Sequence, residues 1–205
     1  LLTLSGGTIN VSGRLDRPSF VAVTKINISG GTLNLNTVGS TSTTNSPFMV
    51  DVTGSSFNMS GGTIVIKNEG GTGAQDLGYN NTGCLADYSV TGGTLQIGNA
   101  SASAGQNMRI LTNIPVGNLV VETTNSPTAT LVTNPLTVLS AVNIKANGTF
   151  NANNLNVTVG GNWINDGTFL PVTNTVTFNG TGTLTGASVS TLNSAFHNVI
   201  ITGTL

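Results

Sequence analysis

The chain has 205 residues and a formal net charge of −1, and only 6% of its residues are Asp, Glu, Lys or Arg. Ordinary globular domains carry roughly 25% charged residues, and the few Lys and Arg here are scattered, which argues against binding to nucleic acid or to an anionic membrane surface. The 38% hydrophobic residues alternate with polar ones, which argues against disorder, and no apolar run is long enough for membrane insertion.

The N-terminal half repeats one ten-residue phrase, which begins at residues 2, 26, 57 and 88 and therefore at intervals of 24, 31 and 31. In each copy positions 1, 3, 8 and 10 are apolar or aromatic, and positions 5 and 6 are Gly-Gly. Because side chains alternate along a strand, the phrase predicts two short strands that share an interior and a glycine corner between them. One copy per coil of a solenoid is expected, with Ile28, Met59 and Val90 buried.

The longer intervals need outward loops, and the segment from Lys67 to Asp87 is the best binding candidate among them. It combines polar and aromatic side chains, a mixture that suits a glycan or protein ligand. The proposed ligand-binding residues are Asp76, Tyr79, Asn80 and Asn81. The alternative is an ordinary solvated loop.

Two other features of this segment are interpreted as structural. Gly70 to Asp76 resembles a calcium-binding nonapeptide, but the aspartate comes one residue late and the motif occurs once, so we expect no metal site. The lone Cys84 is expected to be a small buried apolar side chain.

The C-terminal half keeps alternating strands but changes the corner phrase. Its corner glycines are Gly148, Gly167, Gly182 and Gly203, at intervals of 19, 15 and 21 residues, which predicts tighter coils or an alternation of corner types. Three prolines mark a junction at residues 110–135. We expect one continuous domain over residues 1–205; a separate β-sandwich in the C-terminal half is the alternative.

These patterns predict an all-β protein, a right-handed parallel β-helix with essentially no α-helix. Asn, Thr and Ser at equivalent positions of successive coils would form hydrogen-bonded ladders, whereas repeated charges would repel one another. Both ends of the sequence interrupt the repeat, so further coils of the same polypeptide are expected at one or both ends.

Several segments resemble the β-helical repeats of very large Bacteroidetes cell-surface proteins that the type IX secretion system exports. The resemblance is carried by residues 155–169, 175–183 and 196–201, and by 57–64 and 95–105. His197 departs from it, since related repeats carry Tyr there. The resemblance implies an extracellular, adhesin-like stalk, in some members connected with gliding motility, that presents loops to a surface glycan or protein ligand.

An enzyme is the first alternative, because parallel β-helices also host polysaccharide-processing enzymes. Such chemistry needs paired carboxylates, and the acidic residues do not recur at one position of the repeat, although Asp51 and Asp87 could meet from neighbouring coils. His197 lies in a strand-like context, and Trp163 is expected in the core or at a coil edge. We therefore expect no catalytic residues and no cofactor.

Ice binding is the second alternative, because flat β-helix faces with Thr-x-Thr rows can order water. Thr175 and Thr177, and Thr183 and Thr185, are spaced in this way. The variable repeat length predicts that such threonines do not align into a regular plane.

Overall fold

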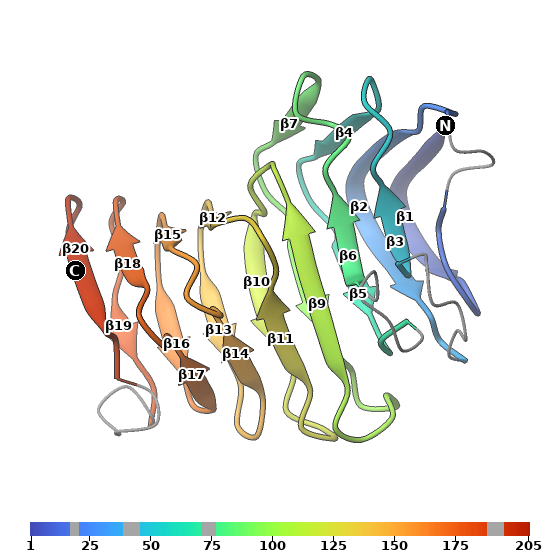
Figure 1. Cartoon of the computed structure of the whole chain (residues 1–205). Coiled ribbons are helices and arrows are strands. Elements are labelled where there is room, and N and C mark those ends of the chain that lie inside the picture. Colours follow the sequence, from blue (N-terminus) through green and yellow to red (C-terminus); the bar gives the residue numbers. More distant parts are fainter. Residues whose placement is uncertain (17–20, 39–45, 71–76, 188–194) are drawn as a thin grey trace.

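The computed structural model describes residues 1–16, 21–38, 46–70, 77–187 and 195–205. All regular structure in this part of the chain is β-strand, and every pairing between strands is parallel. Figure 1 shows the strands stacked side by side from the blue N-terminus to the red C-terminus. The predicted all-β parallel β-helix is therefore confirmed.

Each full coil contributes one strand to each of three faces, which follow one another in chain order. Face 1 contains the first halves of β1 (Leu2–Asn10) and β2 (Lys25–Leu35), then β4 (Ser56–Met59), β7 (Tyr88–Val90), β12 (Leu136–Val138), β15 (Val157–Val159), β18 (Thr175–Phe178) and β20 (Asn198–Ile201). Face 2 contains the second halves of β1 and β2, then β5 (Thr63–Ile66), β8 (Thr94–Ile97), β10 (Asn118–Val121), β13 (Val142–Ile144), β16 (Trp163–Asn165) and β19 (Leu184–Thr185). Face 3 contains β3 (Phe48–Val50), β6 (Leu77–Asn81), β9 (Asn107–Thr112), β11 (Thr128–Leu131), β14 (Thr149–Asn151) and β17 (Thr168–Leu170).

The four Gly-Gly corners lie directly over one another between faces 1 and 2, as the repeat predicts. The second glycine of each pair has positive φ, for example 76° at Gly31 and 73° at Gly62. A Cβ atom at Gly62 would lie 2.8 Å from the carbonyl carbon of Gly30, one coil below. Glycine is therefore required twice over, for its backbone angle and for the close approach of successive coils.

The interior of the helix is filled by the apolar positions of the repeat. Ile28, Met59 and Val90 are buried, as predicted. In the C-terminal coils the interior is aromatic, and Trp163 is fully buried with its ring centroid 4.8 Å from that of Phe169. This continuous core provides the main hydrophobic stabilisation.

The second half uses two corner types in alternation, which explains its uneven glycine spacing. Gly148 and Gly167 lie between faces 2 and 3, where the Thr168 amide donates to the Gly148 carbonyl at 2.9 Å. Gly182 and Gly203 lie between faces 1 and 2, where they continue the stack of the Gly-Gly corners. The parallel ladders of faces 2 and 3 run through residues 110–135, because β10 pairs with β8 and β11 pairs with β9.

Side-chain amides form the predicted ladders between coils. On the outer surface the Asn34 amide donates to the Asn10 side chain at 2.8 Å, and the Asn58 amide donates to Asn27 at 2.9 Å. At the corner after face 2 the buried Asn68 amide donates to the Asn36 carbonyl at 2.7 Å. Neutral donors and acceptors thus replace surface charge along the rod.

Candidate functional site

The residues predicted to form a ligand-binding loop do not lie in a projecting loop. Tyr79, Asn80 and Asn81 belong to β6 and are buried, and Tyr79 is only 2% exposed. The Tyr79 ring stacks on Phe48 of the preceding coil, with centroids 4.7 Å apart. The prediction of an exposed site at these three residues is wrong, and Asp76 lies outside the described residues.

The interior position of these residues has chemical consequences. The Asn81 amide donates to the Tyr79 hydroxyl at 3.2 Å, which gives that hydroxyl a buried partner. Burial raises the pKa of Tyr79. Cys84 is buried as predicted, and burial, with a smaller contribution from the negative charge of Asp87, raises its thiol pKa to about 11.

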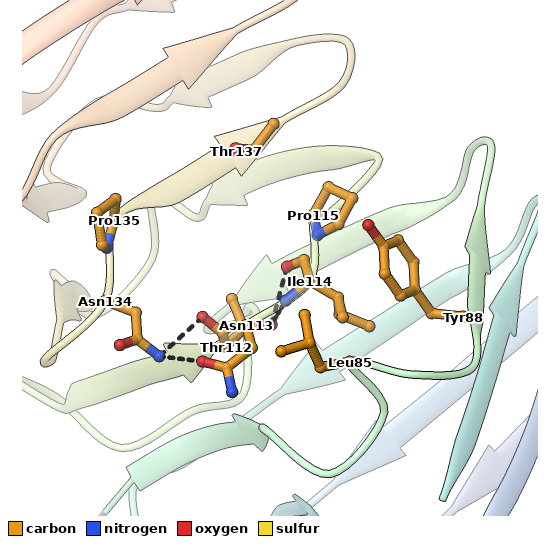
Figure 2. A pocket seen from close by; sticks show the side chains of 9 residues that line it. All are labelled: Leu85, Tyr88, Thr112, Asn113, Ile114, Pro115, Asn134, Pro135 and Thr137. Carbon is orange, nitrogen blue, oxygen red and sulfur yellow. Dashed lines mark hydrogen bonds between the residues drawn. The ribbon is translucent and has the colours of Figure 1, made fainter. Parts of the chain in front are cut away.

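A groove of about 540 Å³ opens on face 1 where the wide N-terminal coils meet the narrower C-terminal coils. Figure 2 shows Leu85, Tyr88 and Ile114 clustered at one end of the groove, Asn134 and Pro135 at the other end, and Asn113 between them. We call it the coil-5 groove, after the coil formed by β10 and β11. Its lining residues are Leu85, Tyr88, Thr112, Asn113, Ile114, Pro115, Asn134, Pro135 and Thr137.

The coil-5 groove exists because coil 5 has no strand on face 1. Five residues (113–117) connect face 3 to face 2 in this coil, whereas twelve (82–93) do so in the coil before it and ten (132–141) in the coil after it. Only Val116 reaches the next strand of face 1, through an isolated bridge to Val138. The coil therefore takes a short cut: Ile114 and Val116 fill the interior at this level, and no regular strand lies on face 1 outside them.

The lining of the groove is uncharged and amphipathic. Leu85 is 59% exposed and Tyr88 is 43% exposed, so both present apolar surface to solvent. At the polar end the Asn134 amide donates both to the Thr112 carbonyl at 3.2 Å and to the Asn113 side chain. The lining contains no Asp, Glu, Lys or Arg, so the groove suits an uncharged ligand.

Comparison with known proteins adds no relative. No protein-family model, curated protein or solved structure matches this chain.

The threonines of the two Thr-x-Thr pairs do not align into a plane, as predicted: the register partner of Thr175 is Asn198, and that of Thr185 is Ile164. Rows that are one threonine wide do form on the outer faces. Thr8, Thr32, Thr63 and Thr94 are register partners in successive coils of face 2. On face 1 the same holds for Thr137, Thr158 and Thr177. These single rows form although the repeat length varies, because the connections between strands absorb the extra residues while the strands keep their register.

Ion pairs in the described segments are local. Lys145 pairs with Glu122 across neighbouring coils, and Arg14 pairs with Asp16. No group of three or more His, Cys, Asp or Glu residues suited to a metal ion occurs in the part of the chain that the structure describes. His197 is exposed immediately before β20. Among the described residues there is also no helix long and apolar enough to cross a membrane.

Sequence reasoning missed the coil-5 groove, although the signal was present. Pro115 and Pro135 indicated an irregular junction, and proline cannot donate a hydrogen bond to a ladder. The missing strand could have been found by counting the residues between the apolar pairs at Ile110 and Leu119 and comparing this number with the other coils.

Proposed function

We propose that this chain is part of a structural or adhesive stalk of a secreted bacterial surface protein. The stalk holds attachment surfaces for a glycan or protein ligand away from the cell, and it performs no catalysis. The resemblance to type IX-secreted Bacteroidetes proteins suggests the export route and a connection with gliding motility.

The observation that carries this proposal is the continuity of the ladders. Faces 2 and 3 remain hydrogen-bonded coil after coil through both halves of the chain. A parallel stack with one interior has a fixed direction and resists bending, because every coil is bonded along its length to its neighbours. Such a rod is suited to hold its two ends apart and to transmit force between them.

The surface chemistry supports attachment. The outer faces display amides and hydroxyls in rows, as in the Asn10–Asn34 and Asn27–Asn58 pairs. These groups are compatible with neutral polymers, and the coil-5 groove adds an uncharged concave surface of about 540 Å³. We assign attachment to this groove and not to Tyr79, Asn80 and Asn81, because those three residues are buried.

A bead-adhesion experiment tests the proposed function. Beads coated with the chain should adhere to immobilised glycans or cell-surface extracts more strongly than beads coated with a heat-denatured sample of the same chain. Release of reducing sugar from polysaccharides by the purified chain, in the absence of adhesion, would favour a polysaccharide-processing enzyme.

Ice binding is a second candidate, and the aligned threonine rows favour it. Register partners in a sheet lie about 4.8 Å apart. The next-nearest oxygen atoms in a tetrahedral water network with hydrogen bonds of about 2.75 Å lie about 4.5 Å apart. A thermal hysteresis assay at millimolar protein concentration decides this candidate, since freezing without hysteresis eliminates it.

A further inference from the structure

We propose that the coil-5 groove accepts an extended, uncharged peptide strand from a partner protein, which adds to face 1 in the place of the missing strand. This inference deepens the proposed attachment function by naming the class of partner. It rests on that function for its biological role, whereas the binding itself is a separate property of the groove.

One wall of the groove is an open strand edge. On either side of β7 the main-chain groups of Asp87 and Thr91 bond to β4: the Phe57 amide donates to the Asp87 carbonyl at 3.2 Å, and the Thr91 amide donates to the Met59 carbonyl at 3.0 Å. Main-chain groups alternate in direction along a parallel strand, so those of Tyr88 and Val90 are directed toward coil 5. Within the described residues β7 is the last strand of its branch, and these groups have no backbone partner.

The opposite wall belongs to β12 in coil 6. Val116 occupies part of the edge of β12: its amide donates to the Thr137 carbonyl at 3.0 Å, and its carbonyl accepts from the Leu139 amide at 2.9 Å. By the same alternation the Thr137 N–H faces the groove. On faces 2 and 3 one coil lies between coils 4 and 6, and at the usual strand spacing of about 4.8 Å one added strand would occupy the corresponding level of face 1.

The side chains in the groove are those that an added strand would cover. Tyr88 occupies position 1 of the repeat, where Phe57 in the preceding coil is only 1% exposed because β7 lies over it. Tyr88 has no strand above it, and the adjacent Leu85 is more exposed still. An apolar residue on the inner side of an incoming strand would therefore remove both side chains from water.

The chain cannot fill this position itself. The connection from Thr112 to Asn118 is too short for a face 1 strand, and Pro115 in the middle of it has no N–H to donate. Exposed edges are usually blocked by charge, by proline on the edge strand or by a covering segment. Tyr88, Ser89 and Val90 of β7 include no charged residue and no proline, so the edge is open to β-strand addition.

A peptide with the sequence of β15 is the natural probe. Residues 155–160 occupy face 1 two coils further on, where the Leu136 amide donates to the Asn156 carbonyl at 3.0 Å. In the coil-5 groove this peptide would bond to β7 through the groups of Asn156 and Thr158. The probe is therefore the acetylated and amidated hexapeptide, added to the full chain labelled with ¹⁵N.

We expect the peptide to shift the amide resonances of Tyr88, Val90 and Thr137 in a saturable manner. The matched control is the same peptide methylated at the Thr158 nitrogen, which keeps every side chain but loses the donor to the Tyr88 carbonyl. The methylated peptide should bind at least about tenfold more weakly, because it loses one net hydrogen bond and its methyl group clashes with the strand edge.

Protein variants test whether the peptide binds in the groove or on another exposed apolar surface. Leu85→Ser and Tyr88→Ser should each weaken peptide binding at least about fivefold, whereas Leu170→Ser, which changes an exposed residue of β17 outside the groove, should leave it unchanged. Circular dichroism and thermal melting establish that each variant is folded. A pair of folded groove variants that bind as tightly as the parent overturns the proposal.

Other occupants give different results. Equal binding of the methylated and unmethylated peptides, or no saturable shift with either, overturns strand addition. The same is true if cellohexaose shifts these amides while the peptide does not, or if they shift with protein concentration alone, which would indicate a second copy of the chain. Failure of the coated beads to adhere, together with peptide binding, would overturn the attachment role and leave the strand site standing.

Discussion

At the level of the single residue, a stacked corner position requires glycine for two reasons that can be tested separately: its positive φ and the close approach of the neighbouring coil. Gly62 and Gly105 both have positive φ, 73° and 66°, so alanine is strained by about 1–2 kcal/mol at either position. At Gly105 a Cβ meets open space, whereas at Gly62 it meets main-chain atoms of Gly30 and Gly31 within 2.9 Å.

Gly62→Ala should therefore lower the free energy of unfolding by about 1–3 kcal/mol more than Gly105→Ala, because the coils must separate to admit the methyl group. Chemical denaturation of the two variants measures this difference. Equal losses would show that the corners are strained by backbone angle alone and do not depend on the close stack.

The buried thiol of Cys84 makes stability depend on pH in the alkaline range. Its pKa rises from 9.0 to about 11 on folding, because burial disfavours the thiolate. Below about pH 9 both states hold the proton, so the thiol has no effect. As the pH rises from about 9 to 11 the unfolded thiol ionises first, and the free energy of unfolding falls.

Comparison with Cys84→Ala isolates this effect from the titration of Tyr79. The parent protein should lose more stability than the variant between pH 9 and pH 11, as measured by urea denaturation in steps of half a pH unit. Parallel pH profiles for the two proteins would contradict a buried, protonated thiol. The native thiol should also react slowly with iodoacetamide at pH 8.

At the level of the element, the ladders between coils contribute differently to the free energy of unfolding, depending on how deeply they are buried. The Asn68 side chain donates to the Asn36 carbonyl and accepts from the Ser103 amide at 2.8 Å, and it is 6% exposed. Asn68→Ala leaves both partners unsatisfied and should cost about 1–3 kcal/mol for each group that stays dry.

The exposed rung at Asn58 is the control for this ladder. Its amide donates to Asn27 on the outer surface, where water can replace the bond, so Asn58→Ala should change stability by no more than about 0.5 kcal/mol. Thermal or urea denaturation of the Asn68→Ala and Asn58→Ala variants measures the two losses of stability. A larger loss at Asn58 would mean that surface amide ladders stabilise the coils directly.

The strands and corners could be predicted from the sequence because their signal is local and repeated. Alternating apolar residues around Gly-Gly predict which side chains, such as Met59 and Leu95, face the interior. Tyr79, Asn80 and Asn81 were misread because Gly and Asn usually indicate a turn, and only their alignment with β3 shows that they form a strand. The coil-5 groove results from a difference in length between the connections of neighbouring coils, so no single sequence motif predicts it.

At the scale of the whole molecule, the fold is close to one-dimensional, since each coil contacts mainly its neighbours. Stability should then be close to a sum over coils and their interfaces. The register supports this view, because Leu136 of β12 pairs with Val157 of β15 and Val142 of β13 pairs with Trp163 of β16. A whole coil can therefore be removed without changing which residues face the interior.

Deletion of residues 136–156 tests this modular behaviour. Val157 would take the place of Leu136, and β10 and β11 would meet β16 and β17 in the same register. The shortened protein should keep a cooperative unfolding transition, with a denaturant m-value lower by about a tenth, in proportion to the surface lost. Deletion of residues 136–146 is the control, because it removes β12 and β13 and places two face 3 strands, β11 and β14, in succession. That variant should aggregate or lose its β-sheet circular dichroism, and a folded, soluble product would show that the three-face winding is not what holds the rod together.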